Sequence, residues 1–586
     1  FLCSQETFMD YQFPIYTIQN ECQDCYKCVR HCYCKAIKII NGRATVIPEL
    51  CVACGECVRV CPAHAKMIRS DESRLFQLLE GKAPVYASIA PSYSGYFKNI
   101  TLCQLTLALK QLGFTAVSET AHGAQLVSAQ TGRLLRKNPS QVYISSACPA
   151  IVDYIRKYQQ DWIPYITPLD SPVIAHCKQL RKKYGDAIKT VFIGPCAAKK
   201  NEADRFSKIL SLAITFETLE ELLIDHNIKL ENISNDNPAE LALGPAEEGR
   251  VYCIEGGMND TVRDAKADFR YVSVSGLKNL DRMLAKIDPK NLPGGLFIEA
   301  LACQGGCING PVMGKESSGL DVLLTTNKTS SKRTSIGRDV PVDIEQHFYR
   351  DSQNDEEPSE ENIRKALASV GKFSPEDELN CGACGYDSCR DFARALLCGK
   401  AEPAMCHTFL RRNFERTSNA LIKYIPAGVI IVNDKLEIIE SNRHFAELAG
   451  DETLEIFNTL GNLNSMQINQ LLDFSDLFES VIQNGGDIEK FNYSFKKKII
   501  NISIFSITQG KTAGAVIQDV TKSELRREQI AEKAKKVIRQ NVQTVQQVAR
   551  IFGEHIADAE IILNDIAGSY TMNNNDDEDT GKKRTK

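Results

Sequence analysis

Residues 190–199 read TVFIGPCAAK, an apolar run that stops at a Gly-Pro turn and leads straight into a cysteine and a lysine. Apolar strands alternate with amphipathic helices ahead of it in the sequence, over residues 84–90, 104–112 and 141–146. This alternation is typical of α/β folds. It predicts an α/β domain over residues 81–320.

Four cysteines of this domain follow apolar runs in turn-like contexts. Cys148 lies in SSACP, Cys196 in GPCAAK, and Cys303 and Cys307 in ACQGGC. Ligands collect at the carboxyl ends of strands in α/β folds. We therefore expect these four cysteines, here called the central set, to gather around one metal cluster although they are far apart in sequence.

A duplicated cysteine pattern precedes this domain, within residues 1–80. The spacing C-x2-C-x2-C-x3-C occurs twice, which resembles a bacterial ferredoxin with two [4Fe–4S] clusters. In that arrangement the fourth cysteine of each run ligates the other cluster. A zinc site is the alternative. The resemblance implies set one (Cys22, Cys25, Cys28, Cys61) and set two (Cys32, Cys51, Cys54, Cys57).

The three segments of the central set resemble the signature motifs of [FeFe]-hydrogenases, in the family's order and over roughly residues 84–315. The resemblance implies that the central set holds a [4Fe–4S] cube. It also implies that Cys307 bridges this cube to a two-iron unit with CO, cyanide and a dithiolate amine, the whole being the H-cluster.

Further segments resemble the parts of that family that contact the two-iron unit. Residues 90–92 resemble a segment that hydrogen-bonds one cyanide, and Lys199 resembles the lysine that pairs with the other. Residues 256–258 resemble a tight turn near the cluster. The resemblance implies cofactor contacts from Ala90, Pro91, Ser92, Lys199, Gly256 and Gly257, and catalytic roles for Ser92, Lys199, Glu202 and Cys307.

The chain also departs from that family. Ala147 stands where catalytic members carry a proton-shuttling cysteine, and residues 129–134 contain no carboxylate to continue the relay. A missing general acid or base commonly costs about 10²–10⁴-fold in rate. Cys253 is a candidate substitute donor. Other departures are Gly194 and Leu301 in place of methionines, and Pro311 and Val312 within a glycine run.

The polar residues 321–370 are predicted to be a linker with a short helix at 361–369. Residues 371–412 then resemble a small [4Fe–4S] domain, with a helix over 388–397; zinc is again the alternative. We interpret Cys398 as a buried thiol. The C-terminal set has the spacing C-x2-C-x4-C-x16-C and consists of Cys381, Cys384, Cys389 and Cys406.

Residues 413–521 have no metal motif and resemble a PAS domain, a five-stranded sensor module. Strands are predicted at 427–433, 436–440, 490–495, 499–507 and 513–518, with a helix at 442–448 capped by its asparagine.

Residues 522–570 are charged and predicted to be helical. Apolar residues alternate by four and three from Ile538 to Ile566, which favours a homodimeric coiled coil or a partner's helix, the alternative being a single helix packed on the PAS domain. The tail 571–586 has the composition of a disordered segment.

Composition limits the function classes. The 586 residues carry a net charge of −4, which argues against nucleic acid as a partner. No apolar run approaches the roughly 18 residues that span a bilayer, so we expect a soluble cytoplasmic protein. The 22 cysteines are bunched at short spacings, which favours metal over disulfides. The chain starts at Phe1, so the N-terminus is incomplete or Met9 is the start, and residues 1–8 carry no structural weight.

Three functional hypotheses follow. The first is a sensory hydrogenase that reacts slowly with H2, releases protons and passes electrons through three [4Fe–4S] clusters toward a separate kinase or phosphatase. The second is a catalytic hydrogenase that exchanges electrons with ferredoxin. The third is a non-catalytic iron–sulfur scaffold. The first two require hydrogenase maturation proteins to install the two-iron unit.

Overall fold

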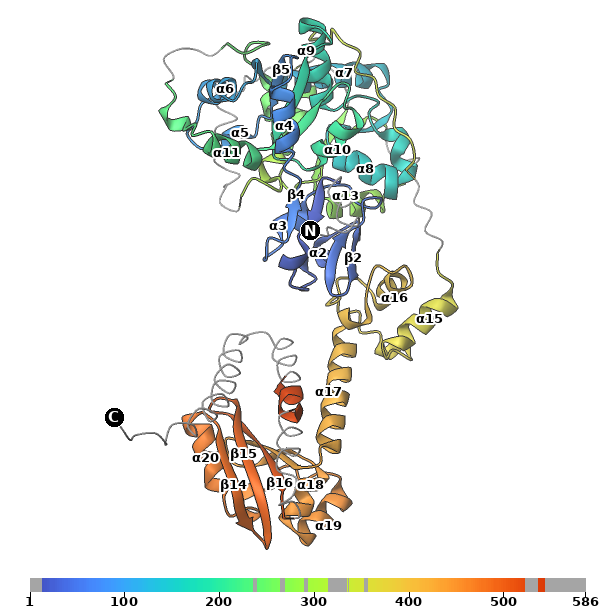
Figure 1. Ribbon diagram of the computed structural model, residues 1–586. Coiled ribbons are helices and arrows are strands. Elements are labelled where there is room, and N and C mark those ends of the chain that lie inside the picture. The colour runs from blue at the N-terminus through green and yellow to red at the C-terminus, as the bar shows by residue number, and fades with distance from the viewer. Residues whose placement is uncertain are drawn as a thin grey trace, which may run out of the picture. The chain divides into compact units, whose positions relative to one another are not determined.

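The structure is a computed structural model that describes residues 13–234, 240–263, 269–288, 294–314, 335, 337–351, 357–521 and 536–542 (Figure 1). The chain separates into two compact units, Phe1–His407 and Thr408–Lys586. Residues 1–8, the tail 571–586 and most of the helical stretch predicted from residue 522 lie outside the described residues.

The N-terminal module is a pseudo-symmetric pair of cysteine loops. Each loop leads into a short helix through a residue in the left-handed conformation, Tyr26 (φ 53°) and Gly55 (φ 81°). Two antiparallel strand pairs, β1–β4 and β2–β3, tie the halves together. The elements are β1 (Ile15–Thr17), α2 (Lys27–His31), β2 (Ile37–Ile40), β3 (Arg43–Val46), α3 (Glu56–Arg59), β4 (Lys66–Ile68) and α4 (Glu72–Leu79).

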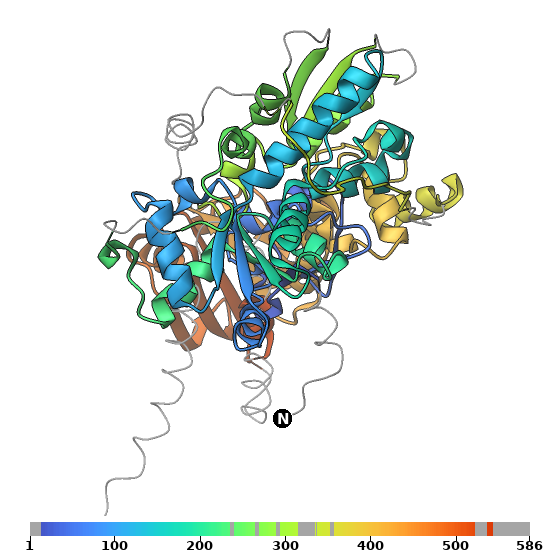
Figure 2. The same cartoon turned by 90° about the horizontal axis from the view of Figure 1, so that it is seen from above.

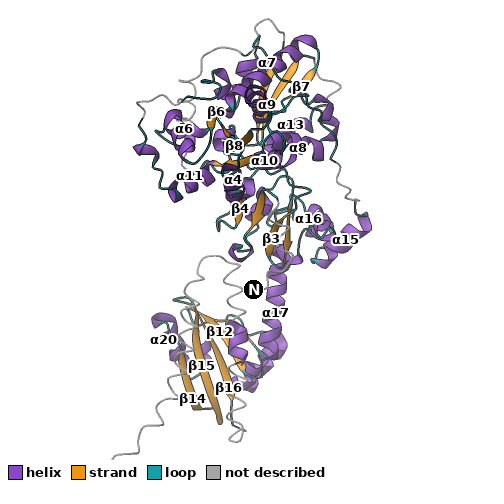
Figure 3. Ribbon diagram, turned by 45° about the horizontal axis from the view of Figure 1, so that its top comes forward, coloured by secondary structure: helices purple, strands orange, loops and turns teal. Residues whose placement is uncertain are grey.

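The central domain contains two parallel sheets, which confirms the predicted α/β class (Figure 3). One sheet has the strand order β6-β5-β8-β9 and the other β10-β11-β7. The strands are β5 (Val85–Ile89), β6 (Ala116–Glu119), β7 (Val142–Ile144), β8 (Lys189–Gly194), β9 (Leu212–Thr215), β10 (Arg270–Ser275) and β11 (Leu296–Leu301). The helices are α5 (Tyr93–Tyr96), α6 (Leu102–Gln111), α7 (Ala121–Lys137), α8 (Pro149–Tyr158), α9 (Pro172–Tyr184), α10 (Ala198–Arg205), α11 (Phe216–Asp225), α12 (Gly257–Val262) and α13 (Leu277–Leu284).

Helices cover both faces of the three-stranded sheet. Val142 and Ile144 point to one face and pack with α8 and α13, whereas Tyr143 points to the other and packs with α7. Figure 2 shows α7 lying along these strands. Strands buried on both faces are apolar throughout, which is why the sequence shows runs rather than alternation.

The segment after the central domain differs from the predicted linker at 321–370. Residues 337–351 pack against the central domain, and Ile344 among them is only 2% exposed. Arg338 donates to the buried Glu248, with 2.9 Å between Nη2 and Oε1. These residues are therefore part of the central domain's surface.

The small cysteine domain is built on two helices, α15 (Glu360–Ser369) and α16 (Cys389–Leu397). They pack through a cluster that includes Ile363 and Ala393, so α15 belongs to this domain rather than to a linker. The Ser388 hydroxyl accepts from the Asp391 N–H and caps α16. Both helices were predicted to within one residue.

The second unit begins with α17 (His407–Tyr424) and contains a five-stranded antiparallel sheet in the order β13-β12-β16-β15-β14. The five predicted strands and the helix after the second are confirmed. Its strands are β12 (Gly428–Asn433), β13 (Ile438–Ser441), β14 (Ile488–Phe495), β15 (Lys498–Thr508) and β16 (Thr512–Asp519), and its further helices are α18 (Arg443–Ala449), α19 (Asp451–Leu460) and α20 (Ser475–Asn484).

The sheet of this unit has two apolar faces. One forms the main core with α18 and α20. On the other, Val429 and Val516 pack with Ile422 near the end of α17 and with Val537 of the helical residues 536–542. The incoming helix and the start of the predicted output helix therefore meet on one sheet face.

Short 3-10 helices complete the described secondary structure: Gln19–Glu21, Gln160–Tyr165, Leu230–Asn232, Glu248–Cys253, Cys307–Asn309, Pro375–Asp377, Pro403–Met405 and Ile468–Gln470. Among the helices of the described residues, none combines the length and apolarity that crossing a bilayer requires.

Asn442 holds three elements of the second unit together. Its Oδ1 accepts from the N–H groups of Val429 and Phe445, each at 2.9 Å, and its Nδ2 donates to the carbonyls of Ile422 and Ala427 at 2.9 and 2.7 Å. Asn442 is only 2% exposed, so water cannot replace these hydrogen bonds.

We expect Asn442→Ala to destabilise the second unit by about 3 kcal/mol, because a cap is lost and buried backbone groups are left unpaired. Hydrogen exchange in the full chain should then become roughly a hundredfold faster over residues 428–449. The exposed Asn458→Ala on α19 is the control and should leave exchange unchanged. Equal exchange in the two variants would contradict this role.

Candidate metal centre

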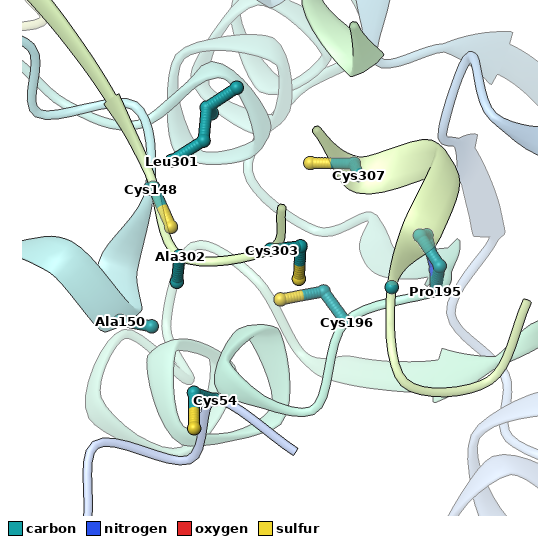
Figure 4. A pocket seen from close by; sticks show the side chains of 10 residues that line it. Cys54, Cys148, Ala150, Pro195, Cys196, Leu301, Ala302, Cys303 and Cys307 are labelled. Carbon is teal, nitrogen blue, oxygen red and sulfur yellow. The ribbon is translucent and has the colours of Figure 1, made fainter. Parts of the chain in front are cut away.

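The central set comes together from both sheets. Cys148 precedes α8 just beyond β7, Cys196 joins β8 to α10, and Cys303 and Cys307 follow β11. Figure 4 shows the four sulfur atoms directed into one common space. The strands β7, β8 and β11 all end beside this space. The prediction that cysteines far apart in sequence gather at strand ends is therefore confirmed, while their role as ligands stays a prediction.

The four thiols are partly buried, and all four line one pocket. Burial, together with a smaller contribution from Cys148, raises the pKa of Cys196 to about 11. Burial also raises the pKa of Cys303 and Cys307 well above the ordinary range, and the other thiols of the set add to the shift. Four adjacent thiolates therefore require a positive partner, as bound iron provides.

An iron–sulfur cube and a single metal ion require different arrangements of their ligands. In the described part of the chain, no group of three His, Cys, Asp or Glu side chains is placed to hold one metal ion. In a cube each of four irons takes one thiolate, so the ligands surround the metal without converging on a point. A zinc ion instead takes four ligands that converge on one point.

In the N-terminal module the cysteines pair crosswise between the two runs. Burial raises the pKa of Cys28 to about 11; Lys66 lowers it, and Cys22, Cys25 and Cys61 raise it. The neighbours of Cys28 are thus the other members of set one, including Cys61 from the second run.

Set two shows the converse. Burial is the largest cause that raises the pKa of Cys51 to about 12, and the thiol of Cys32 from the first run is the second largest. Burial also raises the pKa of Cys54 and of Cys57, and both feel Cys51 and Cys32. The structure brings together the crossed sets that the resemblance implies, while their role as ligands stays a prediction.

Set two lies next to the central set. Cys54 lines the same narrow pocket as the four central cysteines (Figure 4). Pro311 packs on Gly55: a Cβ added there would lie 2.5 Å from the proline Cβ. The residue that breaks the family's glycine run therefore holds the loop of set two against the central domain.

A cavity of about 100 Å³ adjoins the central set, and it is lined by Ala90, Pro91, Ser92 and Lys199, whose role as cofactor contacts stays a prediction. That is far more than a single water needs. Ser92 is fully buried, and its Oγ has no hydrogen-bond partner in the structure. A buried hydroxyl without a partner is costly, so the site suits a ligand that accepts its hydrogen bond.

Lys199 supplies positive charge at the same cavity. Its Nζ donates to Glu202 Oε2 at 2.7 Å and to Ser171 Oγ at 3.0 Å. An ammonium group has three N–H donors, so one remains for a ligand. Glu202 itself lines a neighbouring cavity of about 200 Å³ and therefore orients Lys199 without facing the central cavity.

A lone buried hydroxyl and an ammonium N–H together suit an anionic acceptor. The donors present therefore fit a two-iron unit carrying cyanide ligands. The glycines predicted as cofactor contacts differ. Neither Gly256 nor Gly257 lines the cavity; a Cβ on Gly257 would lie 1.8 Å from the Val251 carbonyl oxygen, so the close approach is to backbone. Met258, the next residue, lines the cavity instead.

Ala147 lines the cavity with a methyl group, which cannot donate a proton. Cys253 lines the cavity too, and its Sγ donates to the Arg250 carbonyl at 3.4 Å. At Gly194 there is no room for a methionine, because a Cβ would lie 2.4 Å from the ring of Phe192, which occupies that space.

Glu299 of β11 also lines the cavity, and sequence reasoning missed it. It accepts from the N–H groups of Met258 and Asn259 at 3.2 Å and from Ser273 Oγ at 3.3 Å. Burial raises the pKa of Glu299 to about 7, although these hydrogen bonds lower it. The sequence signal that could have identified Glu299 is a carboxylate within the apolar run of a buried strand.

The C-terminal set also gathers in space. Burial raises the pKa of Cys384, and Cys406, Cys381 and Cys389 raise it further. Cys398 differs from its prediction as a buried thiol, since it is exposed at the end of α16.

Three protein families match parts of the chain. Residues 83–311 match "Iron only hydrogenase large subunit, C-terminal domain", residues 377–407 "Putative Fe-S cluster" and residues 44–67 "4Fe-4S binding domain". The chain therefore contains an iron-only hydrogenase-type domain of mixed α/β structure and a ferredoxin-type iron–sulfur motif.

Curated relatives match over part of their length. Iron hydrogenase 1 of Clostridium pasteurianum is 24% identical over 326 residues, which cover 45% of this chain and 56% of that protein. A probable cytosolic Fe-S cluster assembly factor of Drosophila melanogaster is 22% identical over 270 residues, 37% of this chain and 57% of that protein. A solved [FeFe]-hydrogenase of Chlamydomonas reinhardtii gives a TM-score of 0.38 at 17% identity, covering 48% of this chain and 100% of that one. The chain thus spans little more than half the length of these two curated relatives.

Glu299 should exchange a proton near neutrality. Because its raised pKa is about 7, the carboxyl should be neutral at pH 6 and ionised at pH 8. Infrared difference spectra between these pH values should show a carboxylic C=O band that Glu299→Gln abolishes. The exposed Glu255→Gln is the control and should keep the band. A band that survives Glu299→Gln would contradict the assignment.

Proposed function

We propose that this chain is a sensory hydrogenase-type protein that reacts slowly with H2 at the central set and passes electrons through iron–sulfur clusters to an output module. The observation that carries the proposal is one cavity wall that keeps Ser92 and Lys199 but has Ala147 in place of a proton donor. The anion-holding groups are present without the fast proton route.

When bound at this site, a two-iron unit supplies the reversible cleavage of H2 into two protons and two electrons. Lys199 and Ser92 would hold its anionic ligands, and the hydrogen bond to Glu202 orients Lys199. Ala147 cannot carry a proton. The loss of a positioned acid or base commonly lowers the reaction rate about 10²–10⁴-fold. Cys253 and Glu299 are the cavity-lining groups left to carry protons slowly.

The output is assigned to the second unit, which we propose to be a PAS domain. Support comes from the sheet face where Ile422 of α17 and Val537 of the following helical residues share one apolar cluster. We propose that a change in α17 reaches the helical residues 536–542 through this cluster. The proposed recipient is a cytoplasmic kinase or phosphatase, with a homodimer formed by the C-terminal helix and ferredoxin as a further redox partner.

A non-catalytic iron–sulfur scaffold is the second candidate. It is favoured by the similarity to proteins named as probable cytosolic Fe-S cluster assembly factors. A scaffold that never receives a two-iron unit has no use for an unpartnered Ser92 hydroxyl or for Lys199 at the cavity. These two groups therefore favour the sensory proposal.

Infrared spectroscopy of anaerobically reconstituted protein, matured with a synthetic two-iron unit, separates the candidates. We expect bands of metal-bound CO and cyanide that shift when N2 is replaced by H2, with H2 turnover far below that of a metabolic hydrogenase. Rapid turnover would favour a catalytic hydrogenase. Absence of the bands after verified maturation would favour the scaffold.

Lys199→Met should prevent retention of the two-iron unit, because an uncharged side chain cannot pair with its anionic ligands. We expect the infrared bands to fall at least tenfold while the visible absorption of the cubes is unchanged. Lys208→Met, an exposed lysine in the turn after α10, is the matched control and should keep both signals. Full bands in Lys199→Met would contradict the role of this lysine.

A further inference from the structure

The small cysteine domain is docked on the first half of the N-terminal module, although more than 300 residues separate them. Glu402 clasps the tip of the β2–β3 hairpin: its Oε1 accepts from the Asn41 N–H at 2.6 Å and its Oε2 from the Gly42 N–H at 3.2 Å. The Ile39 N–H donates to the Lys400 carbonyl at 3.0 Å. A charge-assisted clasp and a main-chain bond make this a specific interface.

The contact involves the loop that carries Cys384. Gly385, the next residue, has φ +95° and lies against α2, where a Cβ would come within 2.8 Å of Val29 Cγ1 and 3.2 Å of the Arg30 nitrogen. Val29 directly follows Cys28 of set one and is fully buried. The backbone at Gly385, next to Cys384 of the C-terminal set, thus lies against Val29, next to Cys28 of set one.

Two cations span the junction. Arg30 donates from Nη2 to the Cys25 carbonyl at 2.9 Å and from Nη1 to the Ala383 carbonyl at 3.3 Å. Lys35 donates to the Gly385 carbonyl at 2.6 Å, and its Nζ lies 5.7 Å from the ring centroid of the buried Tyr386. One guanidinium therefore holds a loop of set one and a loop of the C-terminal set together.

The donor chemistry of the C-terminal set fits a cube, because four cysteines gather there. We propose that Arg30 and Lys35 form a cationic bridge that makes the C-terminal set the direct redox partner of set one and raises the reduction potential of the cluster held there. One electron leaves the reduced cluster of set one, which is oxidised, and enters the oxidised cluster of the C-terminal set, which is reduced.

The electrostatic reason is simple. Reduction adds a negative charge to a cluster, and cations at its loop stabilise that charge, so the potential rises. Set two adjoins the central set through Cys54, so the bridge places the C-terminal set at the far end of the same chain of cysteine sets. Cys406 of that set immediately precedes α17. The chain of sets therefore ends where the second unit begins.

The bridge can be tested without H2, in the full-length protein reconstituted with iron and sulfide but lacking the two-iron unit, with dithionite as the one-electron donor. Redox titration followed by electron paramagnetic resonance gives the potential of each cluster. Cys384→Ser identifies the signal of the C-terminal set. We expect Arg30→Met/Lys35→Met to shift that signal to lower potential and to weaken its magnetic coupling to set one.

Lys27→Met is the matched control, since it removes a positive charge from the same helix as Arg30. An unchanged potential in the double variant, or an equal shift in Lys27→Met, would overturn the bridge. If the double variant binds fewer irons, Glu402→Gln serves instead: hydrogen exchange at Asn41 and Gly42 should become about tenfold faster, and unchanged exchange would overturn the docking. Because no step uses H2, these outcomes are independent of the proposed function.

Discussion

The rest of this structure depends on one constraint: burying several cysteine thiolates together is unfavourable in free energy unless a metal is bound to them. Burial is the main cause that raises the pKa of Cys148, Cys196, Cys303 and Cys307, so without metal these thiols are protonated at neutral pH and their loops lack a common partner. Bound iron replaces the protons and turns four repelling charges into ligands. The loops at the ends of β7, β8 and β11 are therefore stabilised by the cluster as much as they create it.

The same physics connects the sites. Most cysteines of each set lie in loops, with Cys28, Cys57 and Cys389 in the first turns of α2, α3 and α16. Loops must be held by contacts outside themselves if the clusters are to keep fixed separations. Pro311 on Gly55 does this between set two and the central domain, and Arg30 on Cys25 and Ala383 does it between set one and the small domain. In both cases close packing against backbone is possible because a glycine, Gly55 or Gly385, lies at the contact.

Local patterns predicted local structure well. The Asn442 cap, the five strands of the second unit and α15 and α16 were found where spacing placed them, because turns, caps and periodicity act over a few residues. The expectations that differed depend on distant partners. Residues 337–351 pack where a linker was expected, Gly257 approaches Val251 rather than a cofactor, and Cys398 is exposed.

The sequence by itself determined the chemistry of this protein: thiolate ligands in fixed local spacings, a lysine three residues beyond Cys196, and an alanine where a proton donor is expected. Only the tertiary structure decided which groups are neighbours. The crossed sets, the unpartnered Ser92 hydroxyl, the raised pKa of Glu299 and the docking through Glu402 all arise between segments distant in sequence. Desolvation and through-space charge depend on what surrounds a side chain, and strand pairing and loop packing place those surroundings.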